Sequence, residues 1–234
     1  MTKLTFFPEV NSLETLDLSF AVLLKIILIN IVLSGDNAVV IALASRNVPK
    51  KQQKKAIFWG TFGAIILRLI CAVVIVYLLD VPFVSFIGGL LLVYIAIKLL
   101  IDEEEGNLRE GGSSLISAVK TIIIADAVMS LDNVLAIAGA AEGNLAGIMI
   151  GVIISIPIVI FGSQIILKAM EKYPIISYAG AGILSWTAGE MIVGEPKFEP
   201  ILTPELHVLI PTSITVLVIG LGYLFSKKKT SIEG

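Results

Sequence analysis

Residues 26–44 read IILINIVLSGDNAVVIALA, and residues 121–140 read TIIIADAVMSLDNVLAIAGA. Each stretch is almost wholly apolar over about twenty residues, the length of helix that crosses the hydrocarbon core of a bilayer. Each nevertheless places Asp beside Asn, in SGDN and in SLDN. A charged side chain at the centre of a membrane costs about 2.5–3.5 kcal/mol on insertion scales, so the two motifs indicate function as well as fold.

The composition of the whole chain supports the same interpretation. Of its 234 residues, 56% are hydrophobic and 15% are charged, whereas about a quarter of a soluble domain is charged. The charges gather in short blocks between continuous apolar runs, which lack the alternating pattern of barrel strands. We therefore predict an all-α polytopic membrane protein, because only helices and closed barrels satisfy the backbone in lipid.

Cysteine and histidine are too scarce for several kinds of chemistry. The chain has one of each, Cys71 and His207, so an internal disulfide and a thiolate metal cluster are excluded within a single chain. It also has no Walker motif, dinucleotide-binding glycine pattern or hydrolase spacing. We expect neither an enzyme nor an ATP-driven pump, and we expect no cofactor and no nucleic-acid partner.

Seven membrane spans are predicted, and they form a single transmembrane domain over residues 1–234. The spans cover residues 19–45, 56–79, 82–101, 115–140, 145–168, 174–194 and 205–226. Basic residues concentrate in alternate connections, such as RNVPKKQQKK after the first span and SKKKTSIEG after the last. The positive-inside rule then places the N-terminus outside the cell membrane and the C-terminus in the cytoplasm.

The two halves of the chain align when one is moved by 96 residues. At this offset Asp36 falls on Asp132, Asn37 on Asn133, Asn30 on Asp126, Ser34 on Ser130, Arg68 on Gln164 and Tyr94 on Glu190. Residues 19–101 and 115–194 would each hold three spans, so the second unit enters the membrane from the opposite side. Inverted repeats of this kind are typical of secondary transporters, and residues 205–226 are left as an extra helix. The alternative is a chance match, or a duplication without shared function.

Polar side chains form a narrow stripe on the first and fourth spans. Residues at i, i+4 and i+7 share a helix face, which groups Asn30, Ser34 and Asn37 in one span. The same spacing groups Asp126, Ser130 and Asn133 in the other, with Asp36 and Asp132 on the neighbouring edges.

The acids near these stripes outnumber the cations. Arg68 lies inside the second span and can neutralise one carboxylate, while Glu190 adds a negative charge in the sixth span. We expect a cavity prepared for a positive ion. Carboxylate, amide and hydroxyl oxygens suit Mg²⁺, Ca²⁺ or Mn²⁺ better than Cu(I) or Zn²⁺, and buried carboxylates can also relay protons.

A structural role is the alternative for the same side chains. In this alternative, Ser34, Ser130 and Gln164 do no more than form hydrogen bonds between helices, and Arg68 is a fixed partner of one aspartate. Arg68 could instead be an internal counter-ion that fills the empty site. The sequence does not decide between these two roles.

The segments LSGDNAVVIALASRNVP (33–49) and ADAVMSLDNVLAIAGAAEGN (125–144) resemble the TerC family of integral membrane proteins. That family was named for tellurium-ion resistance, and several members are associated with manganese efflux. The resemblance, to the manganese-exporter-like branch, implies Asp36, Asn37, Asp132 and Asn133 as central metal ligands. It implies Asp126 and Glu190 as supporting acids. From the stripes and the repeat, supporting or gating roles are expected for Asn30, Ser34, Ser130, Arg68 and Gln164.

The favoured function is therefore secondary transport of a divalent cation, with Mn²⁺ efflux and exchange for protons as its most specific form. One alternative is an accessory or scaffold protein that delivers or senses metal for a partner complex. Another is a TerC-type tellurium-resistance protein that acts indirectly. The expected partners are the lipid bilayer and the metal ion, and the sequence does not predict a homo-oligomer or protein partners.

Overall fold

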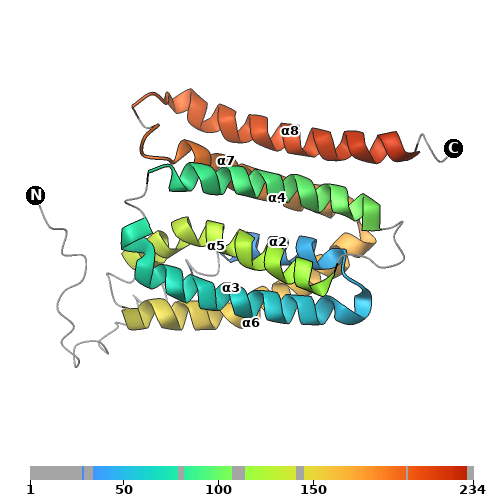
Figure 1. Ribbon diagram of the computed structural model, residues 1–234, viewed down its shortest axis with the longest axis horizontal. Coiled ribbons are helices and arrows are strands. Elements are labelled where there is room, and N and C mark those ends of the chain that lie inside the picture. The colour runs from blue at the N-terminus through green and yellow to red at the C-terminus, as the bar shows by residue number, and fades with distance from the viewer. Residues whose placement is uncertain are drawn as a thin grey trace, which may run out of the picture.

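The protein is a bundle of long helices, shown in Figure 1 as a computed structural model. The structure describes residue 28 and residues 34–78, 82–106, 114–140, 145–198 and 200–230. Side chains are described within these ranges except at 72–78, 102–106, 131–140, 145–152 and 226–230. No strand occurs in these ranges, so the predicted all-α class is confirmed.

Seven helices make up the described part of the chain. They are α2 (Gly35–Arg46), α3 (Lys50–Leu78), α4 (Val84–Gly106), α5 (Leu115–Ala140), α6 (Leu145–Lys172), α7 (Ile175–Val193) and α8 (Pro204–Thr230). Helices α3 to α8 fall on the second to seventh predicted spans. Among the described residues, three segments are both long and apolar enough to cross a membrane: Val84–Ile101, Ile153–Lys172 and Pro204–Phe225.

The prediction that RNVPKKQQKK is a connection is wrong for its second half. Helix α3 begins at Lys50, and the backbone N–H groups of Gln52 and Gln53 donate to the carbonyl of Pro49 at 2.7 and 3.2 Å. Lys and Gln are good helix formers, so the helix continues beyond its apolar part. Helices α4, α6 and α8 run on into charged segments in the same way.

Helix α2 begins at the SGDN motif, inside the span predicted over 19–45. Ser34 is its N-cap residue, and the N–H of Ala38 donates to the Ser34 carbonyl at 3.1 Å. Asp36 lies in the first turn, where a carboxylate interacts favourably with the helix N-terminus. With 12 residues, α2 is about 18 Å long and does not by itself cross a hydrocarbon core of about 30 Å.

The helices form successive layers across the bundle (Figure 1). Helix α8 lies along one edge and packs against α7, which packs against α4. Helices α2 and α5 follow, and α3 and α6 form the opposite edge. The buried core joins these layers through side chains such as Ile41, Leu92, Ile122 and Leu184.

The helix contacts follow a regular pattern. Helix α3 packs against α5 while α6 packs against α2, and α4 contacts α5 while α7 contacts α2. Exchanging α2, α3 and α4 for α5, α6 and α7 converts the α3–α5 pair into the α6–α2 pair and the α4–α5 pair into the α7–α2 pair. The same exchange leaves the α4–α7 pair unchanged. This pattern supports the inverted repeat inferred from the 96-residue offset, which stays a prediction.

Close approach between helices depends on particular glycines. A Cβ atom at Gly189 of α7 would lie 2.5 Å from the Cα of Pro211 in α8. One at Gly89 of α4 would lie 2.6 Å from the carbonyl oxygen of Ala188 in α7. Because glycine has no side chain at these two positions, α7 can pack closely against both α4 and α8.

A buried carboxylate joins the start of α4 to the segment after α7. Glu195 is 2% exposed, and its Oε1 accepts a hydrogen bond from the backbone N–H of Phe83 at 3.0 Å. Phe83 has a φ of 64°, in the left-handed region, and its ring packs against Phe198. The contact holds the turn before α4 in a conformation that a bulky residue rarely adopts.

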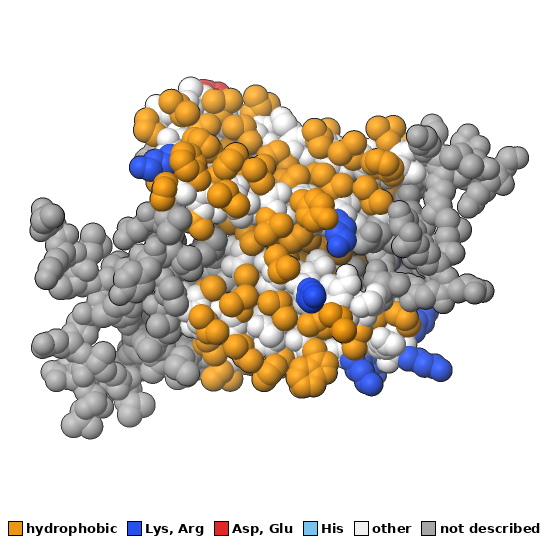
Figure 2. All heavy atoms as spheres, viewed as in Figure 1, with side chains coloured by type: hydrophobic (Ala, Val, Ile, Leu, Met, Phe, Trp, Pro, Cys, Tyr) orange, Lys and Arg blue, Asp and Glu red, His pale blue; other side chains and the backbone are white. Residues whose placement is uncertain are grey.

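The outside of the bundle is largely apolar. Large side chains such as Phe62 in α3, Tyr94 in α4 and Phe161 in α6 are at least half exposed. Figure 2 shows apolar side chains over most of the visible described surface, with separate lysine and arginine side chains that lie mostly in the right-hand half of the view. Such a surface is suited to lipid rather than to water.

Candidate functional site

Three polar side chains from α3 and α5 join in a closed set of hydrogen bonds. Nη2 of Arg68 donates to Oδ1 of Asp126 at 2.7 Å, and Nε of Arg68 donates to Oγ of Ser130 at 3.1 Å. The Ser130 hydroxyl in turn donates to Oδ2 of Asp126 at 3.2 Å. Asp126 and Ser130 are four residues apart on α5, so they share a helix face and meet the same guanidinium.

These three residues are shielded from solvent. Arg68, Asp126 and Ser130 are 4%, 6% and 0% exposed. Removing one member of a buried ion pair leaves an uncompensated charge, which typically costs about 3–5 kcal/mol. The packing of α3 against α5 therefore depends on this arrangement.

A small pocket opens beside the ion pair, between four helices. It has room for about one water molecule. The polar residues that line it are Asn37 of α2, Thr61 and Arg68 of α3, Asp126 of α5 and Ser155 of α6. The pocket thus takes polar groups from helices of both proposed repeats.

Thr61 contributes an oxygen that is free to bind a ligand. Its side chain is 2% exposed, and Oγ1 has no hydrogen-bond partner among the described residues. A buried hydroxyl without a partner is costly, so its presence in the pocket lining indicates a place for a water molecule or a bound ion.

The SGDN motif lies at the edge of the same centre. Asn37 is 2% exposed and lines the pocket, while Oδ1 of Asp36 accepts a hydrogen bond from the backbone N–H of Asn37 at 2.8 Å. Asp36 is close enough to Arg68 and Asp126 to interact with both electrostatically. The start of α2 therefore adds a second carboxylate to the neighbourhood of the ion pair.

The structure does not bring every predicted residue into the pocket. Glu190 has an exposed side chain on α7, Gln164 is partly buried on α6, and neither lines the pocket. Ser34 is buried at the start of α2. Asn30 lies outside the described residues, as do the side chains of Asp132 and Asn133, so their roles stay predictions.

Thr61 and Ser155 were missed by the sequence reasoning. Thr61 precedes Arg68 by seven residues, which places both on one face of α3, so helical spacing around the buried arginine could have found it. Ser155 carries no comparable signal, because it is one of two serines in a largely apolar helix and no charged residue lies within a turn or two of it.

This centre combines oxygen donors with an internal cation. Carboxylate, amide and hydroxyl oxygens are ligands for hard cations, and the guanidinium occupies a place at the carboxylate that such a cation would take. The fold and the site together define a multi-pass helical membrane protein with a buried polar centre.

The chain belongs to the integral membrane protein TerC family, whose model matches residues 16–231. It is 42% identical to the uncharacterized membrane protein YjbE of Bacillus subtilis over 211 residues, covering 90% of this chain and 96% of that protein. It is 25% identical to the inner membrane protein YgdQ of Escherichia coli over 219 residues, covering 86% of this chain and 91% of that protein. No solved structure matches the chain.

Proposed function

We propose that this protein is a secondary transporter that exports divalent metal cations, with Mn²⁺ as its substrate. The observation that carries the proposal is the Arg68–Asp126 pair beside a small oxygen-lined pocket between helices of both halves. A pump or enzyme is not part of the proposal, since the sequence holds no motif for ATP hydrolysis or covalent chemistry. The manganese assignment rests on the family resemblance and on oxygen-ligand chemistry.

In the proposed mechanism Arg68 and the metal ion compete for the same carboxylate. Without substrate, the guanidinium neutralises Asp126 and is held by Ser130. An arriving cation would displace it and bind oxygens of Asp126, Asn37 and Thr61, with Asp36 and the predicted Asp132 and Asn133 completing the site. Movement of one three-helix unit against the other would then change the side from which the site is open.

Transport would run outward from the cytoplasm if the chain has the orientation predicted from its basic connections. Buried carboxylates that lose a metal ion can take up protons, which makes proton exchange the coupling we propose.

Reconstituted protein tests the proposal directly. The purified protein is placed in liposomes that contain a Mn²⁺-sensitive dye, and the initial rate of dye response to external Mn²⁺ is measured. We expect transport by the native protein. The initial rate should fall at least tenfold in the Asp36→Asn variant and in the double variant Asp126→Asn/Arg68→Gln. The double variant removes both charges of the ion pair and so leaves neither unpaired. Glu205→Gln, an exposed acid outside the pocket, is the matched control and should transport normally.

The same preparation separates transport from the accessory role. Vesicles that bind Mn²⁺ but do not accumulate it would favour a protein that delivers or senses metal for a partner. Normal flux in both the Asp36→Asn variant and the Asp126→Asn/Arg68→Gln variant, with correct insertion, would show that the substrate site lies elsewhere.

A further inference from the structure

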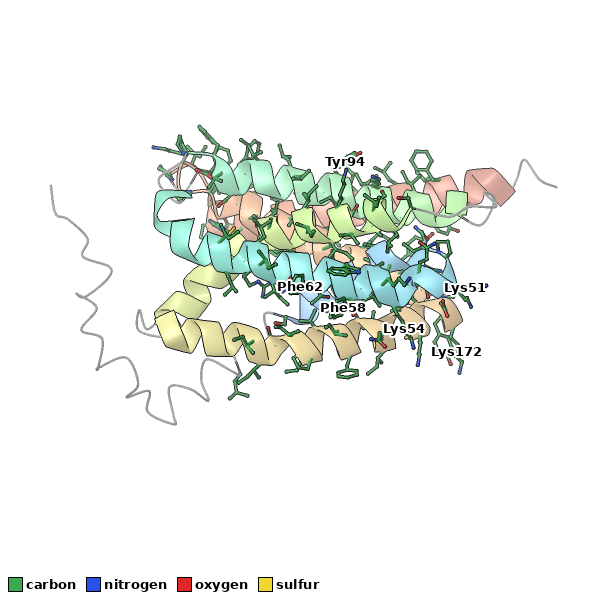
Figure 3. The ribbon with its side chains drawn as sticks, turned by 60° about the horizontal axis from the view of Figure 1, so that its bottom comes forward. Lys51, Lys54, Phe58, Phe62, Tyr94 and Lys172 are labelled. Atoms are coloured by element: carbon green, nitrogen blue, oxygen red, sulfur yellow. The ribbon has the colours of Figure 1, made fainter. Side chains whose placement is uncertain are left out.

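One exposed stripe of α3 changes from basic to apolar along its length. Lys51, Lys54, Phe58 and Phe62 follow one another at spacings of three and four residues, which place them on one side of the helix. All four are exposed, the two phenylalanines by 52% and 50%. Figure 3 shows the lysines at one end of α3 and the rings farther along it.

Helix α6 carries a second stripe of the same kind. Phe161 and Ile165 are 66% and 68% exposed, and exposed Lys168 and Lys172 follow at the end of the helix. Because α6 ends where α3 begins, both stripes become basic at the same end of the bundle (Figure 3).

An ionic contact holds these two basic ends together. Nζ of Lys50 lies 3.7 Å from Oε2 of Glu171, and Nε2 of Gln53 donates to Oε1 of Glu171 at 3.4 Å. Residues 50–55 and 168–172 contain six lysines and a single acid, Glu171. The acids at the end of α4, residues 102–105, belong to a helix that packs mainly against α5, α7 and α8. The α3–α6 end is therefore strongly positive.

We propose that the outer faces of α3 and α6 form a binding site for an anionic phospholipid. Its headgroup phosphate would be bound by Lys51 and Lys54 of α3 on one side and by Lys172 of α6 on the other. Its acyl chains would lie along the exposed side chains of Phe58, Phe62 and Phe161.

The dimensions and the chemistry of this surface fit that ligand. The α3 stripe continues at Ile66, four residues after Phe62 and 44% exposed. Lys54 and Ile66 are separated by about 18 Å along α3, close to the depth of one leaflet of the hydrocarbon core. Lysines near a membrane surface attract acidic lipids. A soluble anion would use the lysines alone and would leave the adjoining apolar stripes without a role, so the combination favours a lipid.

Trp59 is a built-in reporter for this site. It is 54% exposed, and its ring centroid lies 5.4 Å from that of Phe58 and 6.0 Å from that of Phe62. The only other tryptophan is Trp186. The Trp186→Phe protein can therefore be reconstituted in phosphatidylcholine with increasing amounts of bromine-labelled phosphatidylglycerol or bromine-labelled phosphatidylcholine, and quenching of Trp59 fluorescence measured.

We expect Trp59 to be half-quenched at an at least fivefold lower fraction of the brominated anionic lipid than of the zwitterionic one. The triple variant Lys51→Gln/Lys54→Gln/Lys172→Gln should abolish the difference. The matched control Lys227→Gln/Lys228→Gln/Lys229→Gln removes the same charge from α8, at the opposite edge of the bundle, and should retain it.

Four results would overturn the proposal. Equal quenching by both lipids would show that the stripes contact lipid without selecting it, as would a preference unchanged in the α3–α6 variant. Loss of the preference on addition of millimolar inorganic phosphate, at constant ionic strength, would identify a site for soluble anions. Protection of Trp59 from both brominated lipids as protein density rises would show that a second copy covers this face.

Discussion

Nη2 of Arg68 lies 2.7 Å from Oδ1 of Asp126, with the two side chains only 5% and 8% exposed. The pair joins α3, from the first half of the chain, to α5, from the second half. A single contact therefore connects the packing of the two halves with the electrostatics of the pocket beside it.

Separating this pair should destabilise the protein more than removing it. We expect Arg68→Gln alone to lower the free energy of unfolding by about 3–5 kcal/mol, because Asp126 would stay buried without its counter-ion. Adding Asp126→Asn should restore about 2–3 kcal/mol. Unfolding of all variants in a denaturing-detergent titration measures these values, and additive losses in the double variant would contradict a direct coupling.

Removing the Thr61 hydroxyl should weaken substrate binding without lowering the stability of the protein. The Thr61→Val protein keeps the shape of the side chain and removes a buried hydroxyl that has no partner in the described part of the chain, so its stability should be unchanged or higher. If the hydroxyl binds the cation, the KM for Mn²⁺ in liposomes should rise several-fold, and Thr61→Ser should restore it. An unchanged KM in the valine variant would exclude Thr61 from the site.

Gly189 and Gly220 should respond in opposite directions to the same substitution. An alanine at position 189 would place its Cβ 2.5 Å from the backbone of Pro211, so α7 and α8 would have to separate, at a cost of about 1–3 kcal/mol. A Cβ atom added at Gly220 would have no neighbouring atom within 4 Å. Gly220→Ala should therefore be neutral or stabilising, because alanine favours helix. Thermal unfolding in detergent compares the two, and equal effects would contradict the close packing of α7 on α8.

The carboxylate of Glu195 should be needed as a hydrogen-bond acceptor rather than as a charge. Glu195→Gln keeps an oxygen for the N–H of Phe83 and should stay near native stability. Glu195→Leu leaves that N–H without its partner and should lose about 1–3 kcal/mol. Equal stability of the glutamine and leucine variants would show that the bond to Phe83 contributes little.

Helix positions were predictable because hydropathy and length determine a membrane span. The helix predicted over 115–140 is α5 itself, and the one predicted over 174–194 matches α7 to within a residue at each end. Charged extensions such as Lys50–Lys55 were missed, since hydropathy marks the end of the apolar part of a helix and not the end of its backbone hydrogen bonds.

The site was predictable only in part, because a single sequence does not state how helices rotate against one another. The sequence indicated that Arg68 could neutralise one carboxylate, and the structure pairs it with Asp126. The pocket residues Thr61 and Ser155 were not found, since they gain a role only when α3 and α6 bring them to the same place. Glu195 was overlooked because a glutamate between Gly194 and Pro196 is typical of an exposed loop.

The guanidinium at Asp126 also has a consequence for how a carrier of this design would cycle. Arg68 is attached to the chain and cannot diffuse away, so it can return to the acid whenever the transported ion leaves. The unloaded protein would then change conformation without carrying a bare carboxylate through the membrane. Arg68 would thus balance the charge of Asp126 during the return step, and the protons of the proposed exchange would be needed only at the other carboxylates of the site.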